Sequence, residues 1–402
     1  MHAEHDIVII GGGLVGASLA IALAPAGLNV AMVEASPAGA MPPVFDERNL
    51  SCAEATVNGL QGLGVWQHLR APTGAIQRIH ISRVGDFGQV RFDAEDYDRN
   101  AFGRVVVAKD LGDALEASLV TAGVTRYRPA KFLGTRLEAE SRQIDIESDG
   151  QRQTLTCRLL IGADGTSSAV RDALAIQADT FDYGQDLFVC RMRSNKAPDG
   201  TAWERLGPDG PTAVLPRGDR HFGVVHGVSR TDADAVAALD EADYVARIQS
   251  VFGWRAGRFL SAGTRSRYPV MRVVAAALHA PRAVLVGNAA QTIHPVGAQG
   301  FNLGFRDALT LVECVNAHRD GLGSPAMLSA YAAARAEDRQ ETVRMSDGLA
   351  RVTAMESPLL RPFRSVALAA LKTQWLQSRV VGGAMGYRGR VPDICRATGA
   401  NL

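Results

Sequence analysis

The sequence predicts an α/β fold in which a Rossmann-like nucleotide-binding domain is interleaved with an antiparallel-sheet domain and followed by C-terminal helices. Three observations predict this fold class. A glycine-rich turn follows an apolar strand at the N-terminus, short strand-like segments fill residues 180–269, and three helical segments follow residue 300. The length of 402 residues accommodates two or three domains.

We expect the nucleotide-binding domain to occupy residues 1–178, with inserted strands at about 76–100, and to resume at 271–345. The antiparallel-sheet domain then takes residues 179–270, and residues 346–402 form a C-terminal helical region. The formal net charge of +1 excludes the basic footprint of a nucleic-acid-binding protein. Five scattered cysteines without a CxxC pair indicate free thiols in a reducing compartment, not a disulfide framework or a zinc site.

The N-terminal segment is predicted to be a strand, a turn, a helix and a second strand. Residues 7–24 are mostly apolar and long enough to suggest a membrane-spanning helix, but four glycines interrupt them and no Lys or Arg precedes them. A strand at residues 6–10, a helix at 14–26 and a strand at 29–33 explain the pattern better. We therefore expect no leader peptide before this βαβ unit.

The turn of this unit has the spacing of a dinucleotide-binding motif. Gly11, Gly13 and Gly16 form G-x-G-x-x-G directly after the strand, and Glu34 follows the second strand. The first glycine permits the tight turn, the second lets a pyrophosphate approach the backbone, and the third lets the helix pack on the sheet. Glu34 would accept hydrogen bonds from a ribose diol. The motif itself does not separate NAD from FAD.

The rest of the chain alternates between strand and helix patterns. The first half contains a helix at 51–63, a hairpin at 76–83 and 89–92, a strand at 104–107, a helix at 110–121, a meander at 124–127, 131–138, 143–148 and 153–156, and a buried strand at 158–161. The antiparallel region contains strands at 186–193, 201–206, 211–216 and 221–228 and a helix at 242–252. A strand at 283–286 and helices at 300–317, 326–352 and 359–379 complete the pattern.

Two further motifs place a loop between a strand and a helix. Asp164 and Gly165 form an Asp-Gly turn, and Ser167 or Ser168 caps the next helix. Residues 284–308 form a strand, a loop shaped by Gly and Pro, and a helix. A loop this constrained holds backbone donors at fixed points. Because an Asp-Gly turn alone is common, only the three motifs together are specific.

In this order and spacing, the three motifs resemble those of the class A FAD-dependent aromatic hydroxylases, which have the p-hydroxybenzoate-hydroxylase-like fold. The resemblance extends from residue 6 to about 339 and implies a Rossmann-like FAD-binding domain of the GR2 type with an antiparallel-sheet substrate domain. Within this family, residues 287–295 and 46–66 are most similar to the 2-polyprenyl-6-methoxyphenol hydroxylases of ubiquinone biosynthesis. Two departures are Asn288, where many relatives have Asp, and the residue order at 297–300, which is closer to the benzoate hydroxylases.

The resemblance implies cofactor-binding residues in all three motifs and beside the flavin. In chain order they are Gly11, Gly13, Gly16, Glu34, Arg48, Arg104, Asp164, Gly165, Gly287, Asn288, Gly300, Phe301 and Asn302. Arg48 matches an arginine that places the ring system, and Arg104 stands where the family has a polar residue that contacts FAD. Asp164 belongs to a motif shared between the FAD pyrophosphate and NAD(P)H, and Asn288 to a pair at the ribityl segment.

The loop at residues 295–302 matches the segment beside the isoalloxazine ring. The catalytic residues that the resemblance implies are Arg48, Pro295, Gly297, Gln299 and Gly300. A helix beginning near Gly300 would direct its N-terminal N–H groups at the N1–C2=O edge and stabilise the anionic reduced flavin. The reaction implied is flavin reduction by NAD(P)H, formation of a C4a-hydroperoxide with O2, and hydroxylation of a polyprenyl phenol.

Two histidines invite other interpretations. His294 lies in the third motif and could transfer a proton or hold the loop, and His226, on an apolar strand, is expected in the core or a pocket wall. No H-E-x-x-H or nucleophile-elbow sequence is present, so we expect no metal and no hydrolase triad.

Several alternatives stay open at this stage. The chain could be a hydroxylase of small soluble phenols, a prenyl reductase of the same fold, or a non-catalytic nucleotide-binding scaffold subunit of a biosynthetic complex. The basic amphipathic pattern at 359–379 suits either a membrane surface or a partner subunit. We expect a cytoplasmic protein with peripheral contact to the inner membrane, association with a ubiquinone-biosynthesis complex or with itself, and no nucleic-acid partner.

Overall fold

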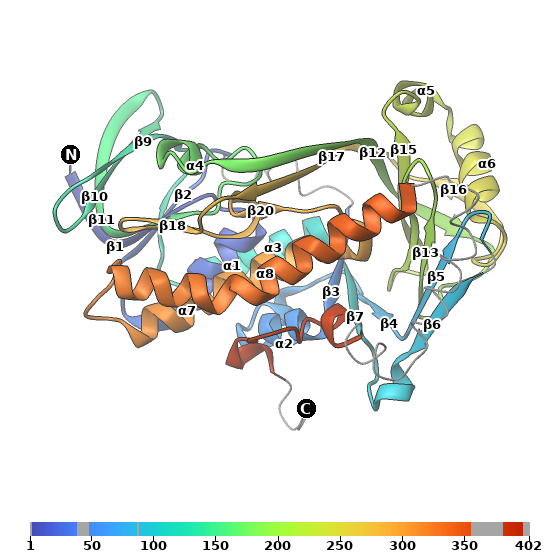
Figure 1. Cartoon of the computed structure of the whole chain (residues 1–402), viewed down its shortest axis with the longest axis horizontal. Helices are drawn as coiled ribbons and strands as arrows, with labels where there is room; N and C mark the ends of the chain where they lie inside the picture. Colours follow the sequence, from blue (N-terminus) through green and yellow to red (C-terminus); the bar gives the residue numbers. More distant parts are fainter. Residues whose placement is uncertain (1, 38–47, 87, 355–380, 397–402) are drawn as a thin grey trace.

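A computed structural model describes residues 2–37, 48–86, 88–354 and 381–396 of the chain. A largely parallel sheet and an antiparallel sheet lie at opposite ends of the molecule (Figure 1). A small third sheet lies between them, and α8 (Pro325–Ala354) runs along much of the length of the molecule. The predicted fold class is confirmed.

The first sheet has the strand order β18-β19-β11-β1-β2-β8. These strands are β1 (His2–Ile10), β2 (Val30–Val33), β8 (Thr125–Tyr127), β11 (Gln151–Gly162), β18 (His279–Ala280) and β19 (Ala283–Leu285), with β9 (Lys131–Leu137) and β10 (Arg142–Ser148) paired antiparallel beyond β11. β1 pairs in parallel with both β2 and β11. From β1 the chain continues to β2 on one side of β1, and it later returns through β11 on the other side. The position between these two directions is the switch point, where sheets of this kind bind ligands.

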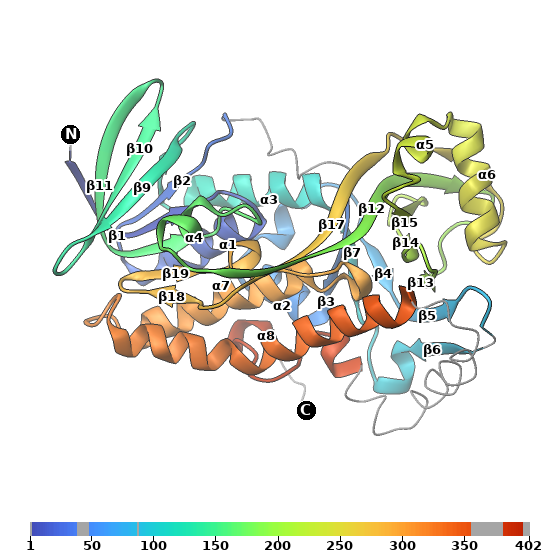
Figure 2. The same ribbon diagram turned by 45° about the horizontal axis from the view of Figure 1, so that its top comes forward.

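Helices cover this sheet because its central strands are apolar on both faces. They are α1 (Leu14–Leu23) with η1 (Ala24–Ala26), α2 (Glu54–Gly62), α3 (Ala108–Thr121), α4 (Ala169–Ala173) and α7 (Gly300–Ala317). α1 packs against α3 and α7, and α7 packs against α8. Figure 2 shows α3, α1, α7 and α8 lying alongside one another next to the sheet.

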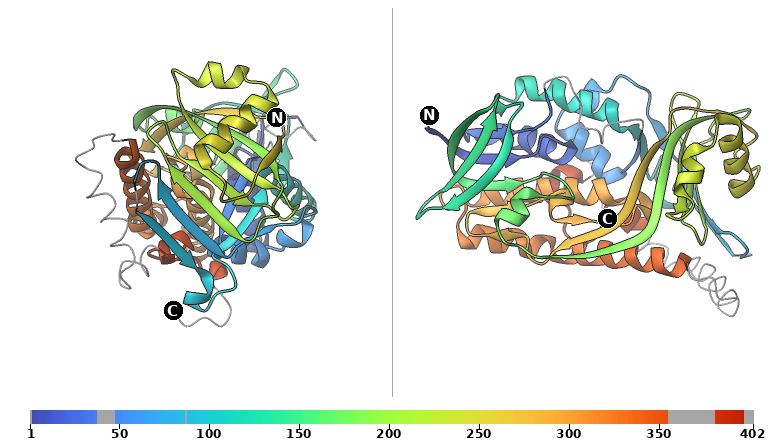
Figure 3. Two further views of the ribbon diagram at one scale, coloured as in Figure 1. Left: turned by 90° about the vertical axis from the view of Figure 1, so that its right-hand side faces the viewer. Right: turned by 90° about the horizontal axis from the view of Figure 1, so that it is seen from above.

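The second sheet has the order β20-β17-β12-β15-β14-β13-β5-β6, with β16 paired to β12. Its strands are β5 (Arg78–Arg83), β6 (Gln89–Asp93), β12 (Ala178–Ser194), β13 (Thr201–Leu206), β14 (Thr212–Pro216), β15 (Phe222–Ser229), β16 (Phe259–Ala262), β17 (Ser266–Ala275) and β20 (Gln291–Thr292). All neighbours are antiparallel except β13 and β5. β12 and β17 run from the region of α4 to the far end, where α5 (Ala233–Ala238) and α6 (Glu241–Phe252) cover one face (Figure 3).

The small sheet joins the two large ones. It contains β3 (Asn49–Ala53), β4 (Gly74–Ile76) and β7 (Gly103–Val107) in the order β3-β7-β4. Its Ile76 and Val105 share one apolar cluster with Ala202 of β13 and Leu215 of β14. Short 3-10 turns complete the chain at η2 (Trp66–His68), η3 (Ala94–Tyr97), η4 (Gly287–Ala289), η5 (Val296–Ala298) and η7 (Asp393–Cys395).

The structure corrects three predicted elements. The helix expected at 51–63 begins at Glu54, because residues 49–53 pair with β7. The strands expected at 153–156 and 158–161 form the single strand β11, half-exposed where it pairs with β10 and fully buried where it enters the sheet core. β8 pairs with β2 and is not part of the meander. The helix expected at 359–379 lies outside the described residues, and the predicted domain boundaries stay predictions.

Candidate functional site

The three motif loops begin at one edge of the parallel sheet. Ile10, Gly162 and Leu285 are the last residues of β1, β11 and β19. Gly162 is paired with both of the others across the sheet. Backbone hydrogen bonds continue this order into the loops, from the Ala163 N–H to the Ile10 carbonyl at 2.8 Å and from the Val286 N–H to the Gly162 carbonyl at 2.9 Å. Segments far apart in the sequence therefore meet at the carboxyl ends of the strands.

The first loop is shaped by two glycines that touch protein backbone. Gly11 has φ +105°, and a Cβ there would lie 2.5 Å from the carbonyl oxygen of Ala163. A Cβ on Gly16 would lie 2.0 Å from the carbonyl oxygen of Gly11. Neither position accepts a side chain without movement of the backbone, which explains two of the three motif glycines by packing within the protein.

Glu34 lies beside this loop at the end of β2. Its carboxylate accepts hydrogen bonds from the N–H groups of Gly12 at 2.7 Å and Ser36 at 2.8 Å. Each oxygen holds one of these bonds, so each keeps a second acceptor site. The structure therefore fixes the carboxylate next to the loop with acceptor capacity for the ribose hydroxyls that the sequence assigned to it.

Four other motif glycines face open space. A Cβ added to Gly13, Gly165, Gly297 or Gly300 would meet no described protein atom within 4 Å. They belong to three different loops, in contrast to Gly16, which is enclosed by backbone. A long cofactor lying along this edge would meet bare backbone on each loop, so the residues present fit a dinucleotide such as FAD.

Asp164 holds the second loop in shape. It accepts hydrogen bonds from the Ser168 hydroxyl at 2.6 Å and the Val170 N–H at 3.0 Å, while burial raises its pKa. Ser168, of the two serines considered, is the residue that caps α4. Asp164 is thus fixed by the protein, and Gly165, with φ +85°, presents its backbone outward.

The third loop is anchored from below by a charged side chain. The N–H of Gly287 donates to Asp307 Oδ2 at 3.3 Å, and a Cβ at this glycine would lie 3.2 Å from Val15 of α1. The neighbouring Asn288 is exposed, so its amide is accessible. Asn288 therefore offers both a donor and an acceptor at the position where relatives carry Asp.

The segment that precedes α7 contains two successive left-handed residues. Gly297 has φ +73° and Ala298 has φ +51°, which is unfavourable for a residue with a Cβ. Pro295 precedes this turn, and the Gln299 amide N–H donates to the Gly297 carbonyl at 3.1 Å. The buried Oε1 of Gln299 has no hydrogen-bond partner among the described residues.

The N-terminus of α7 follows directly. The first bond within the helix runs from the Leu303 N–H to the Gln299 carbonyl at 2.9 Å. The N–H groups of Gly300, Phe301 and Asn302 precede it, so they have no partner within the helix. This helix start is suited to a partial negative charge, as expected for the reduced flavin.

The Asn302 side chain is fully used by the protein. Its Oδ1 accepts from the Ala53 N–H at 2.9 Å and the Thr56 hydroxyl at 2.7 Å, and its Nδ2 donates to the carbonyls of Ser51 and Ala298, both at 2.9 Å. These four bonds fasten α7 to β3 and α2. Only its backbone N–H remains for the cofactor role that the sequence implied.

The two predicted arginines lie in different surroundings. The Arg48 guanidinium lies 4.6 Å from the centre of the Tyr268 ring, on β17 of the antiparallel sheet. Arg104, on β7, donates to the Thr73 hydroxyl at 2.9 Å. Arg48 therefore joins the nucleotide-binding part to the antiparallel sheet, and contact of either arginine with the cofactor stays a prediction.

The antiparallel sheet presents a distinct face to this loop. Cross-strand neighbours share a face, and one row runs Val189, Val225, Ala213 and Glu204 from β12 to β13. The Gly297 N–H donates to Glu204 Oε1 at 3.4 Å, so this row faces the segment before α7. Burial raises the pKa of Glu204 to about 7, and the Gly297 N–H lowers it only in part. Sequence reasoning missed Glu204, because no local motif marks it.

Both histidines considered from sequence are held by the protein. The His294 ring pairs with Gln185 Oε1 at 3.2 Å and with the Val296 N–H at 3.1 Å, and burial lowers its pKa to about 4. His226 lies on the opposite face of the sheet between Thr212 and the Arg247 guanidinium of α6, and burial lowers its pKa to about 3. These contacts favour the structural interpretation of each.

Sequence reasoning also missed a buried ionic network beneath the loops. Arg306 of α7 donates to Asp338 of α8 at 2.7 Å, and Arg335 donates to Asp338 at 2.8 Å and to Asp307 at 2.7 Å. Asp307 also receives the Gly287 N–H. The i, i+3 spacing of Arg335 and Asp338 was visible in the sequence, but their partners on α7 were not.

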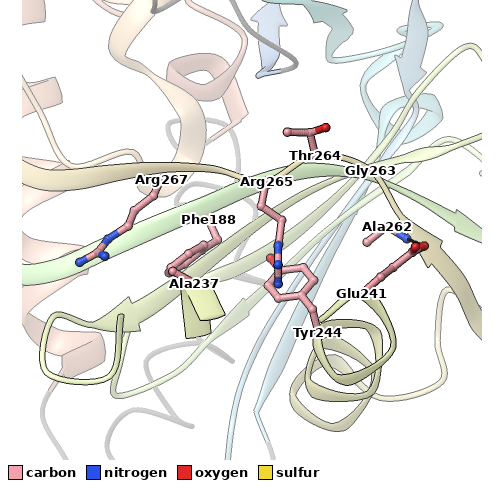
Figure 4. A pocket seen from close by; sticks show the side chains of 9 residues that line it. All are labelled: Phe188, Ala237, Glu241, Tyr244, Ala262, Gly263, Thr264, Arg265 and Arg267. Atoms are coloured by element: carbon pink, nitrogen blue, oxygen red, sulfur yellow. Dashed lines mark hydrogen bonds between the residues drawn. The ribbon is translucent and has the colours of Figure 1, made fainter. Parts of the chain in front are cut away.

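A separate cavity of about 420 Å³ lies on the far face of the antiparallel sheet (Figure 4). Its lining includes Phe188 of β12, Tyr244 of α6 and Arg267 of β17. It belongs to the side covered by α5 and α6. The loop at residues 295–302, called the flavin loop from here on because the family resemblance implies that it lies beside the flavin ring, contacts the other side through Gly297. No cluster of three or more potential metal ligands occurs among the described residues.

This geometry defines a class: a dinucleotide-binding protein in which a second, antiparallel sheet contacts the loop before α7. Residues 4–346 match the family model described as an FAD binding domain. The ubiquinone hydroxylase UbiL of Rhodospirillum rubrum is 33% identical over 355 residues, covering 86% of this chain and 81% of that protein. The 3-demethoxyubiquinol 3-hydroxylase of Escherichia coli is 29% identical over 384 residues, covering 91% and 94%.

The solved structures agree on the fold. The p-nitrophenol 4-monooxygenase PnpA of Pseudomonas putida superposes with a TM-score of 0.79 at 17% identity, covering 97% of this chain and 100% of that chain. The chain belongs to the FAD binding domain family. It is an FAD-dependent monooxygenase, a class that takes electrons from NAD(P)H and oxygen from O2.

Proposed function

We propose that this monooxygenase hydroxylates the ring of a polyprenylated phenol in ubiquinone biosynthesis. The observation that carries the proposal is the face of the antiparallel sheet that lies against the segment before α7. Val189, Val225 and Ala213 make it apolar, and Glu204 adds one carboxyl group. An apolar wall with few polar groups is typical of a site for an aromatic substrate. Relatives that are named as ubiquinone or demethoxyubiquinol hydroxylases support the same substrate class.

Bound FAD would supply the transfer of electrons from NAD(P)H and of one oxygen atom to the ring. The protein would hold the cofactor and the substrate in position. The loops at Gly13, Gly165 and Gly287 would hold the pyrophosphate and ribityl parts, and the N–H groups at the start of α7 would be directed at the ring edge. The left-handed turn at Gly297 would let the backbone approach the ring without a side chain at that position.

A polyprenyl substrate dissolves in the bilayer, so we propose a peripheral contact with the inner membrane from the cytoplasm. No helix in the described ranges is long and apolar enough to cross a membrane. The basic amphipathic segment at 359–379 falls outside those ranges. We also propose that the protein associates with a biosynthesis complex or with itself, because the intermediates are poorly soluble in water.

The proposal is tested by deleting the gene and identifying the quinone precursor that accumulates, then supplying that precursor to the purified protein in detergent micelles. We expect a yellow protein, bleaching by NAD(P)H, and oxygen-dependent hydroxylation of the prenylated phenol. A matched phenol with a methyl group in place of the prenyl chain is the control. Preference for the methyl analogue would favour a small-phenol hydroxylase, reduction of the chain a prenyl reductase, and a colourless protein unable to take up FAD a scaffold.

A further inference from the structure

Glu204 lies where the two parts of the site meet. It is on β13, its neighbour across the antiparallel pair is Ala213, and its neighbour in the parallel pair is Ile81. The Gly297 N–H reaches Oε1 at 3.4 Å, and no other hydrogen bond to Glu204 is formed among the described residues. Within the described ranges, Oε2 therefore has no hydrogen-bond partner at the boundary between the flavin loop and the apolar sheet face.

The other polar side chains near this boundary make hydrogen bonds within the protein, although Oε1 of Gln299 has no partner among the described residues. His294 has both ring nitrogens in hydrogen bonds, and Gln299 is tied to the turn through its amide. The Tyr268 ring on the same sheet face lies under the Arg48 guanidinium, four strands away from β13. In the row formed by Val189, Val225, Ala213 and Glu204, the carboxyl group belongs to Glu204. This residue is half-buried, so a ligand can reach it.

We propose that Glu204 is the catalytic base that takes the proton of the substrate's phenol hydroxyl. This role rests on the proposed function, because it requires a phenol. The phenol O–H bond breaks, its electron pair stays on the ring oxygen, and the proton goes to Oε2. The ring carbon then carries more electron density for forming a C–O bond to one atom of O2, while the O–O bond breaks with the two electrons that NAD(P)H supplies and the second oxygen atom leaves as water. After oxygen transfer, the ring loses its C–H proton to water and Glu204 returns its proton to the ring oxygen.

The surroundings of Glu204 suit a proton acceptor that works near neutral pH. Burial without a cationic partner raises its pKa to about 7, and the Gly297 N–H opposes this. Its neighbours Ile81 and Ala213 are uncharged. Arg191 shares this face of the sheet but is paired with Asp219 at 3.9 Å. A base whose pKa is close to the working pH combines a large deprotonated fraction with a useful driving force.

The test compares the wild-type holoenzyme with E204Q, E204D and E241Q, using NAD(P)H, O2 and the prenylated phenol in micelles between pH 5.5 and 9. E241Q is the matched control, because Glu241 lines the far cavity on the other face of the sheet. FAD content and the rate of flavin reduction are measured for each variant alongside the rate of hydroxylation.

We expect wild-type hydroxylation to rise with pH through an inflection near pH 7. E204Q should lose that inflection and about 100-fold in rate at pH 8 with normal FAD content and flavin reduction, and E204D should keep a pH-dependent rise at a lower rate. Retention of the inflection and of the rate in E204Q overturns the proposal, as does a loss of FAD in both Glu204 variants. Failure of the wild type on every phenol rejects the proposed function instead.

Discussion

Two carboxylates, the fully buried Asp338 and the half-buried Glu204, show how the protein separates structure from chemistry. Asp338 on α8 lies between Arg306 and Arg335, which outweigh the effect of burial and lower its pKa to about 2. Among the described residues, Glu204 on β13 accepts a hydrogen bond only from a backbone N–H, and burial raises its pKa to about 7. Asp338 is therefore charged at any physiological pH, whereas Glu204 can exchange a proton.

The contrast extends to the backbone of the loops. Gly11 and Gly16 are enclosed by other backbone atoms, whereas Gly13 and Gly300 face open space. The enclosed glycines are packed by the protein itself and stabilise the fold. The open glycines leave space for a cofactor or substrate, and we expect them to contribute to function at the expense of stability.

The largest expected effect comes from removing the Asp338 carboxylate, whose charge is balanced by two buried arginines. Asp338→Ala leaves Arg306 and Arg335 buried without their shared counter-ion, and should cost about 3–5 kcal/mol in the free energy of unfolding. Denaturant unfolding of the apoprotein measures this. An Asp347→Ala control on the same helix, where the carboxylate is less buried, should cost much less. Equal losses in the two variants would contradict the assignment of Asp338 to the core.

Glu204→Gln should change stability in the opposite direction. The pKa of Glu204 is raised in the folded state, so the folded protein binds its proton more tightly and loses stability as pH rises from about 4.5 to about 7. Gln removes this loss and should raise the free energy of unfolding by about 1–3 kcal/mol at pH 8. The gain should vanish at pH 4. A Tm difference from wild type that does not vary with pH would refute the raised pKa.

The acid side of the stability profile tests Asp338 again. Its pKa is lowered in the folded state, so its contribution is complete above the unfolded pKa and disappears as pH falls through about 2. We expect Asp338 to account for about 2 kcal/mol of the stability lost between pH 5 and pH 2. Unfolding of the wild type and D338N over this range should show a smaller slope in the variant.

The smallest effect on the fold is expected at an open glycine. Gly13→Val adds a side chain that meets no described protein atom near Cβ, so the apoprotein should unfold within about 0.5 kcal/mol of wild type. FAD affinity should nevertheless fall sharply, because the side chain occupies the space next to the loop. Gly16→Val, where Cβ would meet the Gly11 carbonyl, should destabilise the apoprotein itself. Normal FAD binding by G13V would show that the cofactor does not lie there.

Much of the fold could be predicted from the sequence because its signals are local. The glycine spacing at residues 11–16, the Ser168 cap and the apolar period of residues 300–317 each determine an element from neighbouring residues. Residues 49–53 were misassigned because their strand exists only through pairing with β7. Glu204 and the network around Asp338 could not be found, because each depends on contacts between segments that only the folded chain brings together.

In the proposed reaction, this chain places one atom of O2 on a prenylated phenol ring. The most direct measurement is a turnover of the FAD-loaded protein with NAD(P)H, the prenylated phenol and ¹⁸O2, followed by mass spectrometry of the quinol product. We expect a product that gains one ¹⁸O atom on the ring. A product without ¹⁸O, or NAD(P)H oxidation that yields only hydrogen peroxide with every phenol tested, would contradict it.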